Sequence, residues 1–204
     1  MDKLMTTFVV CTVLAIAACN QGGQSAASSE SQAEAGEFDG YEIINVEGSP
    51  AERVVKRNAD GTVVEEGMLY NGQKIGAWIT YEPEGNFPAK LITYADGQYN
   101  GTYLEFNQRG HITLRATYKN NQLHGPWAAY SFGRVEKKAN YKNGELDGTY
   151  LEYNKKTGKI QKEANYKDGV QHGTYRFYDE EGNVMLEYEY RNGEKVEGTV
   201  QQPA

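Results

Sequence analysis

The sequence predicts an all-β fold, an elongated antiparallel meander of about six repeated β-hairpins. Three observations support this prediction. A glycine and an aromatic residue return together about every 24 residues, Asn-Gly or Asp-Gly pairs recur at the same interval, and apolar and polar side chains alternate between them. Self-similarity at a short fixed period is typical of stacked-repeat architectures, in which each unit contacts mainly its neighbours.

The glycine-aromatic unit occurs five times, and residues 196–200 are a degenerate sixth copy. The aromatic two residues after the glycine defines a post-glycine row: Trp78, Tyr103, Trp127, Tyr150 and Tyr175. Three residues further along lies a distal row: Tyr81, Phe106, Tyr130, Tyr153 and Tyr178. In a strand these two rows lie on opposite faces, so one joins the buried face and the other stays at least partly exposed. The recurring glycine indicates a bulge or the close approach of a neighbouring ring.

A second set of residues, the marker row, recurs between these units at intervals of 23 to 25 residues: Leu69, Tyr94, Tyr118, Tyr141, Tyr166 and Tyr190. A turn pair follows most of them, at 71–72, 96–97, 143–144, 168–169 and 192–193, and Asn120-Asn121 takes this place once. Asn-Gly and Asp-Gly favour type I′ turns, in which both central residues have positive φ. The sequence therefore predicts six hairpins in register.

The opposite end of each unit carries another glycine, at positions 61, 85, 110, 133, 158 and 182. From Gly158, the side chains of Ile160, Lys162, Ala164 and Tyr166 alternate with polar residues, as in a half-buried antiparallel strand. Roughly twelve such strands would span about 55 Å. Residues 38–60 are predicted to add capping strands before a repeat domain at 61–200, and Pro203 discourages pairing beyond the last edge.

The N-terminal segment predicts an exported, lipid-anchored protein. Residues 1–18 combine a short polar start with an apolar run, as in a secretory signal peptide. The string Ile16-Ala17-Ala18-Cys19 resembles the lipobox of bacterial lipoproteins, which implies cleavage before Cys19 and lipidation of its thiol. Residues 19–37 read as a flexible tether rich in Gln, Gly, Ser, Ala and Glu. A plain signal peptide with an incidental cysteine and a retained membrane helix are the alternatives.

Composition narrows the range of functions. The formal net charge is −7, and four of the acidic residues lie at positions 30–39, so the repeat region is only mildly acidic and lacks the basic surface that nucleic acid requires. Because Cys11 would leave with the signal, the processed chain would keep one cysteine and form no internal disulfide. We therefore expect a bacterial cell-envelope protein, anchored at the outer membrane, on either its periplasmic or its surface face.

The string Tyr-Lys-Asn-Gly-x-x-x-Gly-Thr-Tyr at residues 141–150, with its sibling at 166–175, resembles the MORN repeat in its bacterial variant. Proteins of this variant are often grouped as YwqK-like antitoxins. The resemblance covers residues 61–200 and implies a hairpin stack that binds and neutralises a toxin. A cytoplasmic antitoxin needs neither export signal nor anchor, so an envelope-anchored immunity or binding protein would reconcile the two. MORN repeats in other settings mediate contact with proteins or membrane lipids.

Catalytic, metal and cofactor signatures are missing from the sequence. His124 and His172 hold the same repeat position, about four strands or roughly 19 Å apart, which is too far to share a metal ion. No phosphate-binding loop, cysteine pair or catalytic triad context occurs. We therefore expect no enzyme activity, no metal and no cofactor.

The leading hypothesis is a lipid-anchored envelope protein whose hairpin stack binds another protein, with a toxin as one candidate. The post-glycine row is the candidate binding surface, because exposed rings act as interface anchors. A glycan- or cell-wall-binding module that stacks sugars on the same rings is the alternative. A purely structural role is the third hypothesis, since rings in register also stabilise a sheet by cross-strand packing.

Overall fold

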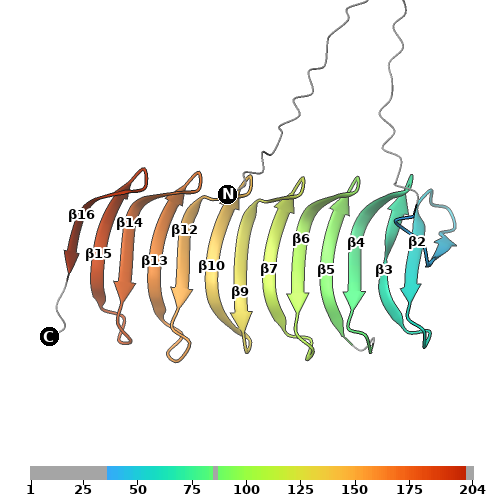
Figure 1. Ribbon diagram of the computed structural model, residues 1–204, viewed down its shortest axis with the longest axis horizontal. Coiled ribbons are helices and arrows are strands. Elements are labelled where there is room, and N and C mark those ends of the chain that lie inside the picture. Colours follow the sequence, from blue (N-terminus) through green and yellow to red (C-terminus); the bar gives the residue numbers. More distant parts are fainter. Residues whose placement is uncertain (1–35, 85–86, 201–204) are drawn as a thin grey trace, which may run out of the picture. The chain divides into compact units, whose positions relative to one another are not determined.

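The computed structural model describes residues 36–84 and 87–200, and in this part of the chain every strand belongs to one antiparallel sheet. The strands pair in the order in which they follow along the sequence, so the sheet is a meander (Figure 1). The all-β hairpin stack predicted from the sequence is thus confirmed. The signal segment, Cys19 and the tether up to residue 35 lie outside the described residues.

The strand bounds follow the repeat. They are β1 (Tyr41–Asn45), β2 (Glu52–Arg57), β3 (Val63–Tyr70), β4 (Gln73–Tyr81), β5 (Pro88–Ala95), β6 (Gln98–Phe106), β7 (Ile112–Lys119), β8 (Gln122–Leu123), β9 (Gly125–Ser131), β10 (Arg134–Lys142), β11 (Glu145–Leu146), β12 (Gly148–Tyr153), β13 (Ile160–Lys167), β14 (Val170–Tyr178), β15 (Val184–Arg191) and β16 (Glu194–Val200). The β8–β9 and β11–β12 pairs are each one strand interrupted at a single residue, so β3 to β16 make up the twelve expected repeat strands.

The Asn-Gly and Asp-Gly turns adopt the backbone that the sequence predicts. Their first residues have φ between 46° and 52°, and their glycines have φ between 72° and 89°. Asn120 and Asn121 keep positive φ without a glycine. In each turn after the first, the second residue's N–H donates to a carbonyl of the preceding repeat, at 2.8 to 3.0 Å; these acceptors belong to Lys74, Tyr99, Leu123, Leu146 and Gln171. This ladder of bonds between neighbouring turns holds the hairpins in register.

Four turns at the opposite edge depend on a side chain that the sequence analysis did not identify. Asn58 Oδ1 accepts hydrogen bonds from the N–H groups of Asp60 and Thr62, at 3.0 and 2.9 Å. Asn107, Asn154 and Asp179 cap the equivalent turns with the same type of bond. The signal was an Asn or Asp three or four residues before the turn glycine, a residue type that commonly bonds its own turn.

The recurring glycine of each unit lies in a bulge. Between Ile92↔Tyr103 and Tyr94↔Tyr99, β6 advances two residues further than β5, and the other complete units repeat this offset. The bulge glycines have φ between 63° and 113°, a region that residues with a β-carbon avoid. Gly198 lacks positive φ, and the degenerate sixth unit has only one extra residue. The bulge expected from the sequence is confirmed, but no ring lies against these five glycines.

Rings do cover other small residues, and these form the core of the sheet. Trp127 pairs directly with Ala139, and Tyr150 and Tyr175 flank Ala164. Ala164 and its equivalent Ala116 are 0% and 1% exposed, because the large rings of neighbouring strands extend across them. In most hairpins, large side chains on the strand after the turn thus alternate with small ones on the strand before it. A sheet one layer thick obtains a buried row in this way.

Candidate binding surface

The post-glycine row and the marker row lie on the same face of the sheet. Five ring pairs join them, each within 6.4 Å between centroids: Trp78–Tyr94, Tyr103–Tyr118, Trp127–Tyr141, Tyr150–Tyr166 and Tyr175–Tyr190. We call these ten rings the aromatic stripe. The post-glycine rings pack edge-on or tilted against the marker tyrosines.

Trp78 is the most deeply buried member of the stripe, with 3% of its surface exposed. Phe38 and Tyr41, at the start of the described chain, lie over its indole at centroid distances of 6.0 and 6.3 Å. Lys74 Nζ lies 4.4 Å from the indole centroid and also pairs with Glu37 at 3.4 Å. Trp78 therefore supports the N-terminal cap and is not open to a partner.

The remaining post-glycine rings, Tyr103, Trp127, Tyr150 and Tyr175, are half-buried. Lysines from the strands between them border the rings: Lys90 Nζ lies 5.8 Å from the Tyr103 centroid, and Lys162 Nζ lies 5.5 and 5.8 Å from those of Tyr150 and Tyr175. The arrangement gives the face apolar ring area with cationic borders. Such a surface suits an apolar side chain accompanied by a carboxylate.

Two glutamates accept hydrogen bonds from stripe phenols and fix their orientation. The Tyr103 hydroxyl donates to Glu105 and the Tyr150 hydroxyl donates to Glu152, each at 2.6 Å. Burial, followed by these hydrogen bonds, raises the pKa of both tyrosines. The bond from Tyr150 is also the main cause that lowers the pKa of Glu152. These phenols stay neutral donors across the physiological range.

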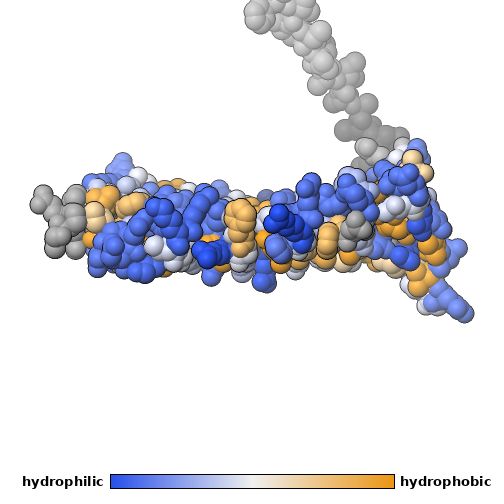
Figure 2. Space-filling view, turned by 90° about the horizontal axis from the view of Figure 1, so that it is seen from below, coloured by the Kyte–Doolittle hydropathy of each residue, from blue (hydrophilic) through white to orange (hydrophobic). Residues whose placement is uncertain are grey.

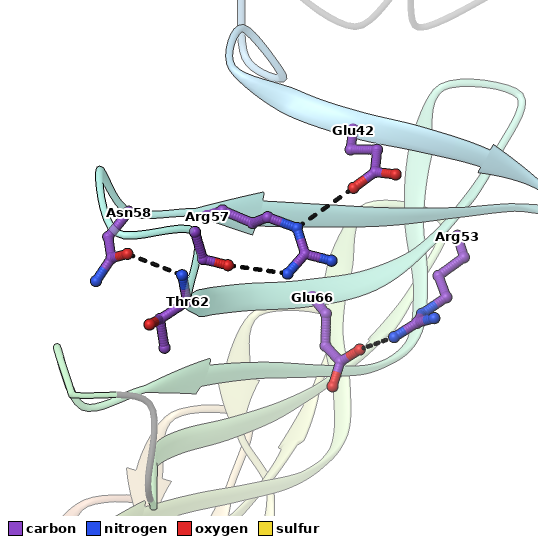
Figure 3. Close-up of polar contacts among 7 residues, drawn as sticks. Glu42, Arg53, Arg57, Asn58, Thr62 and Glu66 are labelled. Carbon is purple, nitrogen blue, oxygen red and sulfur yellow. Dashed lines mark hydrogen bonds and ion pairs between the residues drawn. The ribbon is translucent and has the colours of Figure 1, made fainter.

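The distal row lies on the opposite face, among polar side chains. Tyr81 donates to Glu66 Oε1, and Arg53 donates to Glu66 Oε2, both at 2.6 Å. Hydrogen bonding to Arg53 and then Tyr81 lowers the pKa of Glu66, whereas the same bond raises the pKa of Tyr81 to about 12. Nearby, Arg57 bonds Glu42 and a turn carbonyl (Figure 3). These bonds join β1, β2, β3 and β4, so the charged side chains here have a structural role.

The opposite face also carries a shallow hollow of about 520 Å³. Its floor lies around Ala128, and its lining includes Arg115, Lys138, Tyr130 and Leu151. The hollow follows from the small side chain of Ala128, which replaces the leucine found at the matching position of β6 and β12. Both cations on its rim are exposed.

Within the described part of the chain, no cluster of His, Cys, Asp or Glu is suited to hold a metal ion.

The histidines serve no common site. Nδ1 of His124 accepts a hydrogen bond from the Asn143 N–H at 3.4 Å, so this ring links two neighbouring repeats. His172 and His111 are exposed side chains on other strands and loops.

Among the described residues there is no helix of the length and apolarity needed to cross a membrane.

One aromatic at the edge of the sheet was missed by the sequence analysis. Phe132 occupies the first position of the turn between β9 and β10, with φ of 49° and 95% of its surface exposed. The edge formed by the turns on this side is mostly polar, with scattered apolar patches (Figure 2). The sequence feature that could have revealed this residue is the dipeptide Phe132-Gly133, which stands where other copies carry longer turns.

Comparison of the chain with protein-family models finds no match, and comparison with curated protein sequences finds none either.

Proposed function

We propose that this protein is a lipid-anchored envelope component whose hairpin stack binds another protein through the aromatic stripe. The partner lies across the half-buried rings from Tyr103 to Tyr175, and the lysines bordering these rings pair with its carboxylates. The lipid at Cys19 and the tether that follows keep the stack at the membrane. The MORN-like repeat favours a toxin as the partner, which would make the protein an envelope-held immunity protein.

One observation carries this proposal. The chain's own segment from Phe38 to Tyr41 lies on the stripe at its first ring, Trp78, with two aromatic side chains and a carboxylate from Glu37 beside Lys74. The stripe thus already takes a peptide segment at one end. The post-glycine rings further along hold the same position in later copies of the repeat and are half-buried in a sheet of one layer. This contact within the chain is a precedent for binding protein side chains rather than sugars.

The binding test compares two double variants on the same strands. Tyr150→Ala with Tyr175→Ala removes rings from the stripe, whereas Tyr153→Ala with Tyr178→Ala removes rings of the same type from the opposite face of β12 and β14. Both variants are used as full chains in detergent-solubilised envelopes, after circular dichroism confirms the sheet. We expect a co-purifying protein to be lost from the first variant and retained by the second. Equal capture by both would contradict the proposal.

The alternatives give different results in the same assays. Binding of isolated cell wall or polysaccharide that disappears in Trp127→Ala, with no protein captured, would replace the protein-binding proposal with the glycan-binding one. A secreted toxin encoded beside the gene, and neutralised by the purified chain, would identify the immunity version. For the anchor, incorporation of a labelled fatty acid is expected in the natural chain and not in Cys19→Ser; persistent labelling would rule it out.

A further inference from the structure

The contacts around Trp78 show what a stripe tryptophan receives when it is covered. Phe38 and Tyr41 lie on its indole, and the Tyr41 hydroxyl donates to Glu65 at 2.7 Å. Lys74, on the same strand as Trp78, also covers the indole. Two rings three residues apart in one short segment thus cover the exposed side of a stripe tryptophan that Val54, Leu69 and Tyr94 pack from within the sheet.

Trp127 is the other tryptophan of the chain and holds the same repeat position, two units further along. Each indole comes two residues after a bulge glycine and packs against the next marker tyrosine, Trp78 against Tyr94 at 6.0 Å and Trp127 against Tyr141 at 6.4 Å. Phe38 and Tyr41 lie at the first unit, and Trp127 is half-buried rather than covered. The space over Trp127 that corresponds to these two rings is thus left for another molecule.

The side chains around Trp127 are more apolar than those around Trp78. The position of Lys74 is taken by Leu123, that of Glu65 by Leu114, and that of Thr80 by Ala129. Register places these residues on the same face, because Leu114 pairs with Ala129 and Leu123 pairs with Tyr118. We call this group the Trp127 site: Leu114, Tyr118, Leu123, Trp127, Ala129 and Tyr141. The position of Glu65 thus carries no carboxylate here and that of Lys74 no ammonium; Glu105, which pairs with Leu114, already accepts the Tyr103 hydroxyl.

The border of the site carries one cation. Lys137 pairs with Ala129 in the sheet and with Glu152 across the next strand, where its Nζ lies 3.5 Å from the carboxylate. Its side chain is nearly half exposed, so it can turn to a carboxylate of a partner without leaving a buried charge. The site therefore combines an apolar floor with one adaptable positive charge.

We propose that the Trp127 site binds a short segment of a partner protein that presents two apolar side chains, a phenylalanine and a second ring or aliphatic group three residues apart, with an acidic residue beside them. This rests on the proposed function and specifies where on the stripe the partner is anchored. The segment takes the places over Trp127 that Phe38 and Tyr41 take over Trp78. A tyrosine at the second position binds less well, because Leu114 offers its hydroxyl no acceptor.

The test uses Trp127 as its own reporter. In full-length Trp78→Phe, Trp127 is the one remaining tryptophan, and its emission is followed while a peptide is added. The probe is a peptide of residues 36–45 with Tyr41→Phe, and the control peptide has alanine at positions 38 and 41. We expect a saturable blue shift with the probe, at least tenfold weaker binding of the control peptide, and weaker binding of the unmodified Tyr41 peptide.

Two matched substitutions place the binding on one face. Leu123→Glu, in the site, is expected to weaken binding of the probe at least tenfold, because its carboxylate repels the acidic residue of the segment, whereas Leu151→Glu, on the opposite face, is expected to change it less than twofold. No saturable shift, or equal effects of the two substitutions, would overturn the proposal. The captured partner separates the two levels: retention by Leu123→Glu with loss by the Tyr150 and Tyr175 double variant refutes only the Trp127 site. Retention by both refutes the proposed function as well.

Discussion

The indole of Trp78 lies directly on Gly67, in space that a β-carbon at that position would occupy. Gly67 belongs to the strand before the turn and Trp78 to the strand after it, so the two meet across the first hairpin of the repeat. The equivalent positions in three later hairpins carry alanine, at 116, 139 and 164, and Ala139 pairs with Trp127, whereas the second and the last hairpins carry Ile92 and Tyr188. The first hairpin thus needs the smallest residue where its ring is most deeply covered.

Gly67→Ala is expected to destabilise the sheet by about 2 kcal/mol, because the added methyl group displaces the indole from its covered position. Chemical denaturation followed by circular dichroism measures the change. In a Trp78→Leu background, the same substitution should cost less, since the smaller side chain leaves room. Equal costs in the two backgrounds would show that the glycine is needed for its backbone and not for the ring.

Phe132→Asn is expected to stabilise the protein by about 1 kcal/mol, because asparagine adopts positive φ more readily than a bulky residue. The Phe132 ring is exposed to solvent, so its removal costs little packing. Thermal unfolding measures the shift. Asn143→Phe, at the first position of an Asn-Gly turn with φ of 51°, is the reverse substitution and should destabilise by a similar amount. A loss of stability in Phe132→Asn would mean that the exposed ring makes a stabilising contact.

Phe38→Ala is expected to uncover Trp78 and to cost about 1–2 kcal/mol of unfolding free energy, because a partly buried ring is removed from the cap. In a Trp127→Phe background, Trp78 is the sole tryptophan, and its emission should shift to the red. Phe132→Ala, which deletes a phenylalanine exposed to solvent, should leave this emission unchanged. An unshifted spectrum in Phe38→Ala would indicate that Tyr41 and Lys74 alone cover the indole.

Stability is expected to fall in acid through Glu66. Hydrogen bonds from Arg53 and Tyr81 lower the pKa of this carboxyl in the folded state. Its contribution is therefore present above the unfolded pKa of about 4.3 and is lost as the pH falls toward the lower folded value. Denaturation midpoints between neutral pH and pH 3 should decline less steeply in Glu66→Gln than in Glu145→Gln, a substitution of an exposed residue in β11. Parallel declines would argue against this carboxylate as a source of acid sensitivity.

Much of the fold was predictable because local chemistry specifies it. Asn143 and Gly144 favour one type of turn, and the alternation through Ala164 and Tyr166 assigns a face to each side chain. The placement of the post-glycine rings was less predictable, since spacing shows that Trp78 and Tyr81 lie on opposite faces but not which face is packed. That choice depends on Gly67 and Ala164, small residues on the adjacent strands, which meet the rings only once the strands pair.

The cap was predicted as strands, but its contact with Trp78 was not. Phe38 reaches the indole through a turn before β1, and Glu37, which the sequence analysis assigned to the tether, pairs with Lys74. Contacts between a terminal segment and a ring some forty residues further along leave no periodic signature in the sequence. They matter most for function, because they separate the covered end of the stripe from the end that we propose binds a partner.

The most direct test of that proposal is photo-crosslinking in intact cells, with p-benzoylphenylalanine replacing one tyrosine at a time on two strands. Tyr150 and Tyr175 lie on the stripe, whereas Tyr153 and Tyr178 lie on the opposite face of the same strands. We predict a discrete crosslinked protein from Tyr150 and Tyr175 and none from Tyr153 and Tyr178. Crosslinks of equal yield from both faces, or from the opposite face alone, would contradict the assignment of the aromatic stripe as the binding surface.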